Sequence, residues 1–114
     1  MKNTTIDINE ATIKNFVASI RPEDIEIRKQ LDFGYSFNKN IAILYEIRPN
    51  WINPEEKNHI EFAKIRFYKS KLEWNLYWMR ANEKWELYKP FPKSTHLDEI
   101  IQIIKKDKNG CFFG

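Results

Sequence analysis

Cysteine and histidine are scarce in this chain, which has one cysteine, Cys111, and two histidines among its 114 residues. A single cysteine excludes an internal disulfide, and no Cys/His cluster has the spacing of zinc ligands. The apolar runs are far shorter than the roughly 20 residues that cross a bilayer, and no charged-then-apolar leader opens the chain. These absences predict a cytoplasmic protein with no metal, no cofactor and no membrane span.

The composition that remains is that of an ordered globular domain. Hydrophobic residues make up 42% of the chain and aromatic residues 15%, which is more than a disordered segment carries. A chain of this length can bury one substantial core but not two. We therefore expect a single domain over residues 1–114.

Charge is distributed unevenly, although the net value is only +3. Residues 57–93 carry nine Lys/Arg against four glutamates, while the rest of the chain is slightly acidic. A local surplus of cations favours an anionic partner, but a solvated sheet face has the same composition. Both interpretations stay open at this point.

Three segments have helical patterns. The first is expected to be capped by Asn9 and to stop before Pro22, and residues 22–30 are expected to form a short helix that runs into a strand. The last helix is expected to begin at Thr95, whose hydroxyl would cap it, with Gly110 beyond its end. The apolar stripes of the first and last helices are Ile13, Phe16, Val17 and Ile20, and Leu97, Ile100, Ile101 and Ile104.

Alternation with a period of two predicts five strands, over residues 31–37, 41–48, 62–69, 72–80 and 84–88. Short connections between several of them indicate hairpins and an antiparallel sheet. Trp51, in the long loop 49–58, is expected to fold back over the core. Pro90 and Pro92 are expected to end the sheet, because proline cannot donate to a ladder. The predicted fold is α+β: a five-stranded antiparallel sheet with N-terminal and C-terminal helices packed on one face.

Four motifs occur in order along the chain: YEIRPNW at 45–51, AKIRFY at 63–68, LYWMR at 76–80 and GCFFG at 110–114. Together they resemble a small bacterial family catalogued as a domain of unknown function, over roughly residues 20–114. The resemblance implies a free-standing single domain. It implies no activity, substrate or catalytic residue.

The first candidate site is the sheet face that should point to solvent. Tyrosine rings there would offer stacking platforms worth about 1–3 kcal/mol per base, and cations would meet phosphates. Alternatively, cross-strand pairs of these residues only stabilise a wet sheet face, on which Glu73 and Glu86 are also expected. The candidate binding residues are Lys64, Arg66, Tyr68, Tyr77, Lys84, Tyr88 and Arg80, with Lys69 and Lys71 at the fringe.

An alternative acid-cation site combines Glu46 and Arg48 with Asp32 on the preceding strand. Two carboxylates and a cation in this layout could hold a magnesium ion and steady a phosphate, as in nuclease-like sites. An ion pair that ties the strand to its loop would give the same sequence pattern.

The remaining chemically interesting residues favour structural roles. His59 and His96 are expected to face solvent, and burial should make the Cys111 thiol inert. Phe112 and Phe113 are expected to dock on the core.

The sequence therefore favours a binding module over an enzyme, with single-stranded nucleic acid or another polyanion as the candidate partner. A protein partner or a homodimer is the alternative, because an antiparallel sheet has edges that can pair with another chain.

Overall fold

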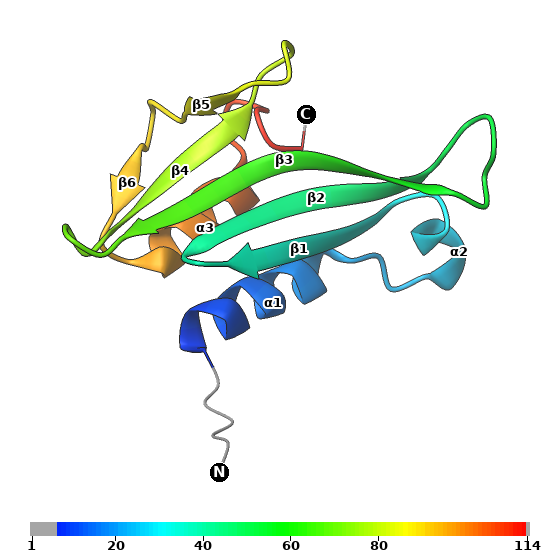
Figure 1. The fold of residues 1–114 in the computed structure, drawn as a ribbon. Coiled ribbons are helices and arrows are strands. Elements are labelled where there is room, and N and C mark those ends of the chain that lie inside the picture. Colours follow the sequence, from blue (N-terminus) through cyan, green and yellow to red (C-terminus); the bar gives the residue numbers. More distant parts are fainter. Residues whose placement is uncertain (1–6, 114) are drawn as a thin grey trace.

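A sheet of six antiparallel strands with helices on one face makes up the fold, in a computed structural model that describes residues 7–113 (Figure 1). The α+β prediction is therefore confirmed; Gly114 of the terminal motif lies outside the described residues. The elements are α1 (Ile8–Ile20), α2 (Ile25–Arg28), β1 (Asp32–Asn38), β2 (Ile41–Pro49), β3 (Lys57–Tyr68), β4 (Glu73–Met79), β5 (Trp85–Leu87), β6 (Lys93–Ser94) and α3 (Leu97–Lys106).

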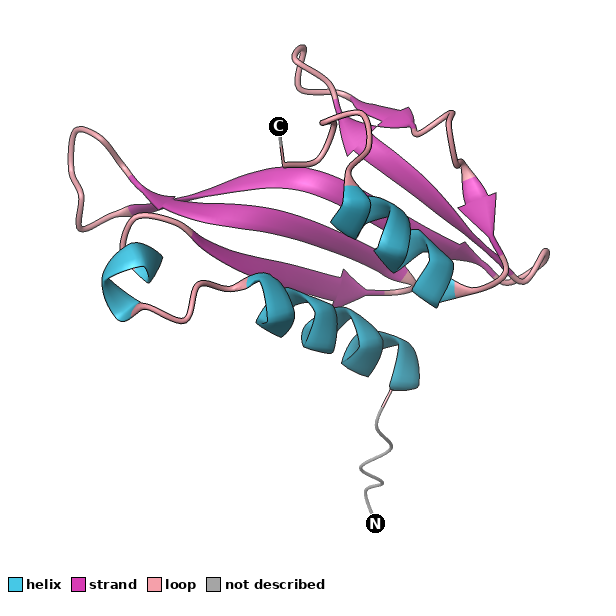
Figure 2. Cartoon of the chain, turned by 180° about the vertical axis from the view of Figure 1, so that it is seen from behind, coloured by secondary structure: helices cyan, strands magenta, loops and turns pink. Residues whose placement is uncertain are grey.

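The strands follow one another as a meander, in the order β1-β2-β3-β4-β5, and β6 also pairs with β4. Both long helices lie on the same side of the sheet, as Figure 2 shows from behind. No helix within residues 7–113 is long and apolar enough to cross a membrane.

The sheet continues past the two prolines, contrary to the prediction from Pro90 and Pro92. β5 and β6 both pair with β4, at Tyr77–Met79 and at Trp74–Asn75 respectively. Pro92 takes part through its carbonyl, which accepts from the Leu76 amide at 2.9 Å. A proline lacks only the donor of a ladder pair, so these residues interrupt the edge strand and do not end it.

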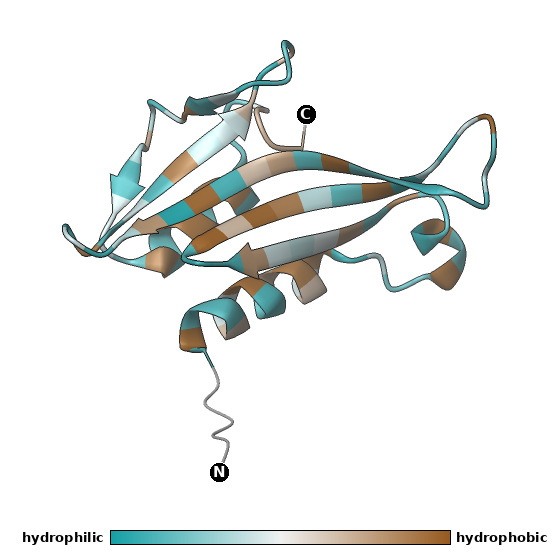
Figure 3. Cartoon of the chain, viewed as in Figure 1, coloured by the Kyte–Doolittle hydropathy of each residue, from teal (hydrophilic) through white to brown (hydrophobic). Residues whose placement is uncertain are grey.

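The core lies between the helices and one face of the sheet. Side chains of alternate strand residues meet the apolar stripes of α1 and α3 there, which gives the banding along β2 and β3 in Figure 3. The six largest fully buried side chains are all aliphatic, and such burial is worth about 1.5–3 kcal/mol for each. They are Ile13, Leu44, Ile65, Leu76, Ile100 and Ile104.

A β-bulge in β3 adds an aromatic residue to this core. The register places Leu44 opposite Ala63 but Tyr45 opposite Glu61, so Phe62 has no partner on β2. Consequently two consecutive residues, Phe62 and Ala63, are both buried, which strict alternation forbids. The bulge explains why the sequence pattern predicted β3 to begin only at Phe62, whereas it begins at Lys57.

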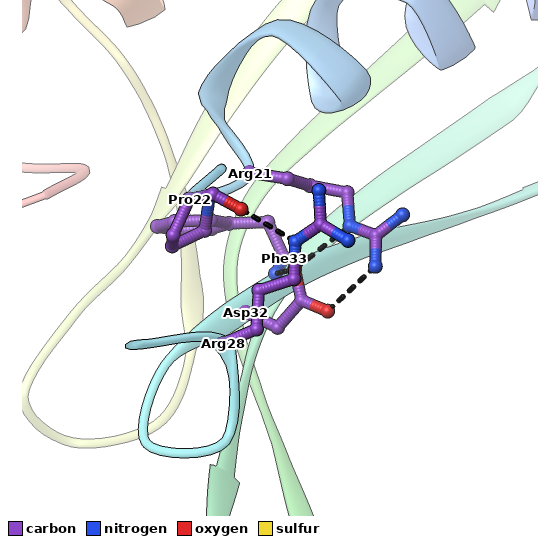
Figure 4. A network of polar contacts seen from close by, with 5 residues as sticks. All are labelled: Arg21, Pro22, Arg28, Asp32 and Phe33. Atoms are coloured by element: carbon purple, nitrogen blue, oxygen red, sulfur yellow. Dashed lines mark hydrogen bonds and ion pairs between the residues drawn. The ribbon is translucent and has the colours of Figure 1, made fainter. Parts of the chain in front are cut away.

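An ion pair joins the end of α1 to the start of β1 (Figure 4). The Nε and Nη2 atoms of Arg21 lie 2.8 and 2.9 Å from the two carboxylate oxygens of Asp32. This guanidinium lowers the pKa of Asp32 from its ordinary value, mainly through its hydrogen bonds. A second contact between these elements is a hydrogen bond that the Tyr35 hydroxyl of β1 donates to the Glu10 carboxylate of α1 at 3.0 Å. The two contacts set α1 along β1.

The helix caps differ from those expected. Asp7, two residues before the predicted Asn9, accepts from the amides of Asn9 and Glu10 and caps α1. At α3 the serine hydroxyl of Ser94, and not Thr95, accepts from the His96 amide at 2.9 Å. Several Asx and Ser/Thr residues stand near each start, and pattern alone does not choose between them.

Asp107 ends α3 and holds the terminal phenylalanines. It adopts the left-handed conformation as the C-cap, a role predicted for Gly110. Its carboxylate accepts from the amides of Phe112 and Phe113, at 3.0 and 2.7 Å. The Phe112 ring packs on Tyr88, and the Phe113 ring on Phe62 and Phe33. The predicted docking of this phenylalanine pair on the core is confirmed.

Asp107→Ala should lower the free energy of unfolding by about 1–3 kcal/mol, because two amides lose a charged acceptor. Urea unfolding followed by tryptophan fluorescence measures this. Glu23→Ala is the control, since Glu23 is exposed and should leave the midpoint nearly unchanged. Equal midpoints for the two variants would contradict the role of Asp107.

Candidate functional site

The face of the sheet opposite α1 and α3 is covered by no element of the described chain; we call it the open face. Residues paired across strands share a face, so the pairing identifies its members. One such row runs across four strands, from Ile43 to Lys64, Tyr77 and Leu87. Figure 1 views the sheet from this side.

Four of the seven predicted binding residues meet at the centre of the open face. The Lys64 Nζ atom lies 5.0 Å from the centroid of the Tyr77 ring, and the Arg66 guanidinium lies 4.7 Å from that of Tyr68. The two tyrosine hydroxyls are hydrogen bonded at 3.0 Å. Each cation is therefore held over a ring, and the rings are joined edge to edge by their hydroxyls.

These two cations have no carboxylate partner among the described residues. Glu73, on the same face, is instead 3.7 Å from Lys93. Glu86 was expected here but lies opposite Trp78, on the helix side, and pairs with Arg80 and Lys89. The open face is thus more cationic than its sequence suggested.

Burial and hydrogen bonding favour the neutral form of Tyr77. Its pKa is raised, first by burial and then by its hydrogen bond to Tyr68, while Asn75 and Arg66 act in the opposite direction. A neutral Tyr77 adds no negative charge beside Lys64.

The other three predicted residues lie elsewhere, and the outward orientation predicted for Tyr88 is wrong. Its side chain is only 2% exposed, it packs on Phe112, and its hydroxyl accepts from Asn109 at 3.0 Å. Trp85 and Leu87 instead occupy the open face, opposite Met79 and Tyr77. The actual register of β5 differs by one residue from the predicted one, and such a shift exchanges every side chain between the faces.

Arg80 and Lys84 flank the β4–β5 connection, away from the tyrosine pair. Arg80 lies over the Trp78 ring at 6.0 Å and 3.3 Å from Glu86, on the helix side. Lys84 is exposed in the turn. Neither adds its charge to the central cluster.

The alternative acid-cation site is not assembled. Asp32 lies opposite Ile47 and Glu46 opposite Phe33, so the two carboxylates belong to opposite faces of the β1–β2 pair. Both oxygens of Asp32 are bound by Arg21, and Glu46 is 2.9 Å from Arg48 in an ion pair of its own. Within residues 7–113 no group of three or more His, Cys, Asp or Glu side chains is placed to hold a metal ion.

Trp51 was predicted to fold back over the core, but it is 88% exposed near the start of the β2–β3 loop. The Asn50 side chain accepts from the amides of Ile52 and Asn53, and the Asn50 amide donates to Glu56. These bonds are formed within the loop, so its backbone turns without contacts to the core. The signal in the sequence was the asparagine before the tryptophan, which favours such a turn.

The remaining singled-out residues have structural surroundings. His59 stacks on Tyr45, with ring centroids 4.4 Å apart. His96 is the N-cap residue of α3. Burial and the nearby Asp107 and Glu86 raise the pKa of the Cys111 thiol. Since the thiolate is the reactive form, this supports the predicted inertness of Cys111.

Comparison with known proteins identifies one family. A family described as "Domain of unknown function (DUF3024)" matches residues 1–114. The match extends over the whole chain, whereas the resemblance carried by the motifs was expected over roughly residues 20–114. No curated protein and no solved structure matches this chain.

The contribution of Tyr77 to the free energy of unfolding should decrease at alkaline pH. Because the pKa of Tyr77 is raised on folding, its contribution is complete below about pH 10, the unfolded value, and is lost as the pH rises through the folded value. As the pH is raised above about 10, urea midpoints should therefore fall less in Tyr77→Phe than in the wild type. Tyr77→Phe should also cost about 0.5–1.5 kcal/mol at neutral pH, for the lost hydrogen bond. Parallel pH profiles for the two proteins would exclude this role.

Proposed function

Because the chain belongs to the DUF3024 family, a domain of unknown function, we propose a function from the geometry of its open face: binding of single-stranded nucleic acid or another polyanion. The observation that carries the proposal is the position of Lys64 and Arg66. Both lie on an uncovered sheet face, over tyrosine rings, with no carboxylate partner in the described chain. Such cations are free to neutralise phosphates.

The arrangement favours contact through the cations more than through the tyrosine rings. Lys64 and Arg66 already lie over the rings of Tyr77 and Tyr68. A base would therefore stack on the flat guanidinium of Arg66, which offers a plane as an aromatic ring does. Lys64, as a compact charge, would contact phosphate. Ile43 and Leu87, the apolar residues at the two ends of the row across the open face, would border the bound nucleic-acid strand on both sides.

The double variant Lys64→Glu/Arg66→Glu should abolish binding of a mixed-sequence single-stranded oligonucleotide at low salt. Lys14→Glu/Lys105→Glu is the matched control, because it changes the net charge equally and lies on exposed positions of α1 and α3. The control should bind nearly as the wild type does. Circular dichroism checks that both variants fold. Equal loss in both variants would show that only net charge matters, and unchanged binding in the first would overturn the proposal.

The salt dependence gives a second, quantitative test. Each phosphate contact to a single strand contributes about −0.7 to the slope of log K against log salt concentration. Replacement of Lys64 and Arg66 by glutamine should therefore make the slope less negative by about 1.4. A slope that does not change would mean that these side chains make no phosphate contact.

A second candidate function is self-association through β1. This strand is seven residues long and pairs, among the described strands, with β2 alone. It contains no proline, and Asp32, its only charged residue, is bound to Arg21. An edge of this kind can add a strand from another copy.

Sedimentation velocity over a range of protein concentrations tests the self-association. A dimer that forms through β1 should dissociate in Ser36→Lys, because Ser36 is exposed at the middle of the strand and an edge lysine opposes strand pairing. Ser70→Lys, in the β3–β4 turn, is the control. A monomer at every concentration would exclude this function, as would a dimer that survives Ser36→Lys.

A further inference from the structure

A cleft of about 580 Å³ lies at the end of the molecule where α2 approaches the β2–β3 loop. Figures 1 and 2 both show these two segments beside one another, away from α3. Three cations line it: Lys29, Arg48 and Lys57. Trp51 lines it as well, and no carboxylate does. The volume is within the usual range for small-ligand sites.

The cleft is held in shape by bonds between its two walls and within the loop. The Lys57 Nζ atom lies 3.5 Å from the Lys29 carbonyl and joins the base of the loop to the end of α2. Within the loop, the Asn50 amide donates to the Glu56 carbonyl and the Glu56 amide to the Asn53 carbonyl, at 2.9 and 3.0 Å. These bonds join the two walls of the cleft and define the backbone of the loop.

The cations of the cleft keep donors available for an anion. Lys29 is 3.1 Å from Glu26, and the Nε atom of Arg48 is 2.9 Å from Glu46. Arg48 has two further nitrogens, which bond to no other described residue. Lys57 has no carboxylate partner within the described chain. A phosphate at this position would meet the two terminal nitrogens of a guanidinium and an ammonium group that has no carboxylate partner among the described residues, and such groups are the usual partners of phosphate in proteins.

Trp51 supplies the second half of the recognition. Trp51 is 88% exposed, and the neighbouring Ile52 is exposed as well. Apolar side chains grouped at one place on the surface favour a binding site there. Beside three cations Trp51 offers a flat plane for an aromatic ring, and such stacking is worth about tenfold or more in affinity per base.

We propose that this cleft binds a nucleotide, with the base stacked on Trp51 and the phosphate between Arg48, Lys57 and Lys29. The site is distinct from the open face and does not depend on the function proposed for it. A free nucleotide and the phosphorylated end of a nucleic acid share this chemistry. Recognition of a nucleotide requires both the Trp51 ring and the three cations, because neither of them alone distinguishes a nucleotide from other ligands.

Isothermal titration calorimetry with adenosine monophosphate at low salt tests the site. Trp51→Ala should weaken binding about tenfold, and Trp51→Phe should retain most of it because the flat ring remains. Lys57→Gln should weaken binding several-fold, whereas the control Lys71→Gln, in the exposed β3–β4 turn, should not. Adenosine alone should respond to Trp51→Ala but not to Lys57→Gln, and inorganic phosphate should show the reverse.

A short oligonucleotide with and without a 5′-phosphate distinguishes the two sources of the ligand. Stronger binding of the phosphorylated oligonucleotide than of adenosine monophosphate would assign the cleft to nucleic-acid ends, and the opposite order to free nucleotides. Loss of adenosine monophosphate binding in Lys64→Glu/Arg66→Glu would place the ligand on the open face and overturn the proposal. No saturable binding would also overturn it, as would Trp51-dependent binding to phosphatidylserine vesicles without nucleotide binding, which would indicate a membrane-facing loop.

Discussion

The packing of α1 and α3 against a single face of the sheet is the contact on which the other features of this protein depend. Ile13 of α1 and Ile100 and Ile104 of α3 are fully buried there, and the strands must direct one set of alternate side chains toward them. The bulge at Phe62 and the terminal phenylalanines extend the same core. The opposite face remains uncovered, so it must tolerate water.

The open face meets this requirement with side chains that combine apolar length and a polar end. Lys64 and Arg66 lay their charges over tyrosine rings, which shields the apolar surface while the cations stay hydrated. The same arrangement that lets this face contact water also leaves two cations without a carboxylate partner among the described residues. The exposure of the face and its positive charge therefore have one physical origin.

The chain offers a second concentration of positive charge, at the cleft beside Trp51, and the two differ in shape. The open face is broad and follows the strands, which suits an extended polyanion. The cleft is concave and is bounded by α2 and the β2–β3 loop, which suits a compact ligand. β3 contributes to both, with Lys64 and Arg66 near its end on the open face and Lys57 at its start in the cleft. The other two cations of the cleft, Lys29 and Arg48, come from the end of α2 and from β2.

Much of the fold could be read from the pattern, and the errors have specific causes. Trp85-Glu86-Leu87-Tyr88 alternates equally well in either register, and Tyr88 is buried because Phe112, 24 positions later, packs against it. Trp51 was predicted to fold over the core, whereas it is exposed on a loop whose turn is closed by bonds of Asn50. Asp32 and Glu46 stand on adjacent strands, but their register assigns them to opposite faces. By itself, therefore, the sequence determined the α+β class, the helix stripes and the central Lys64, Arg66, Tyr68 and Tyr77 cluster, because local periodicity and short hairpins encode them. The β5 register, the exposed Trp51 and the cationic cleft were decided only by the tertiary structure, because they depend on contacts between residues far apart in the chain.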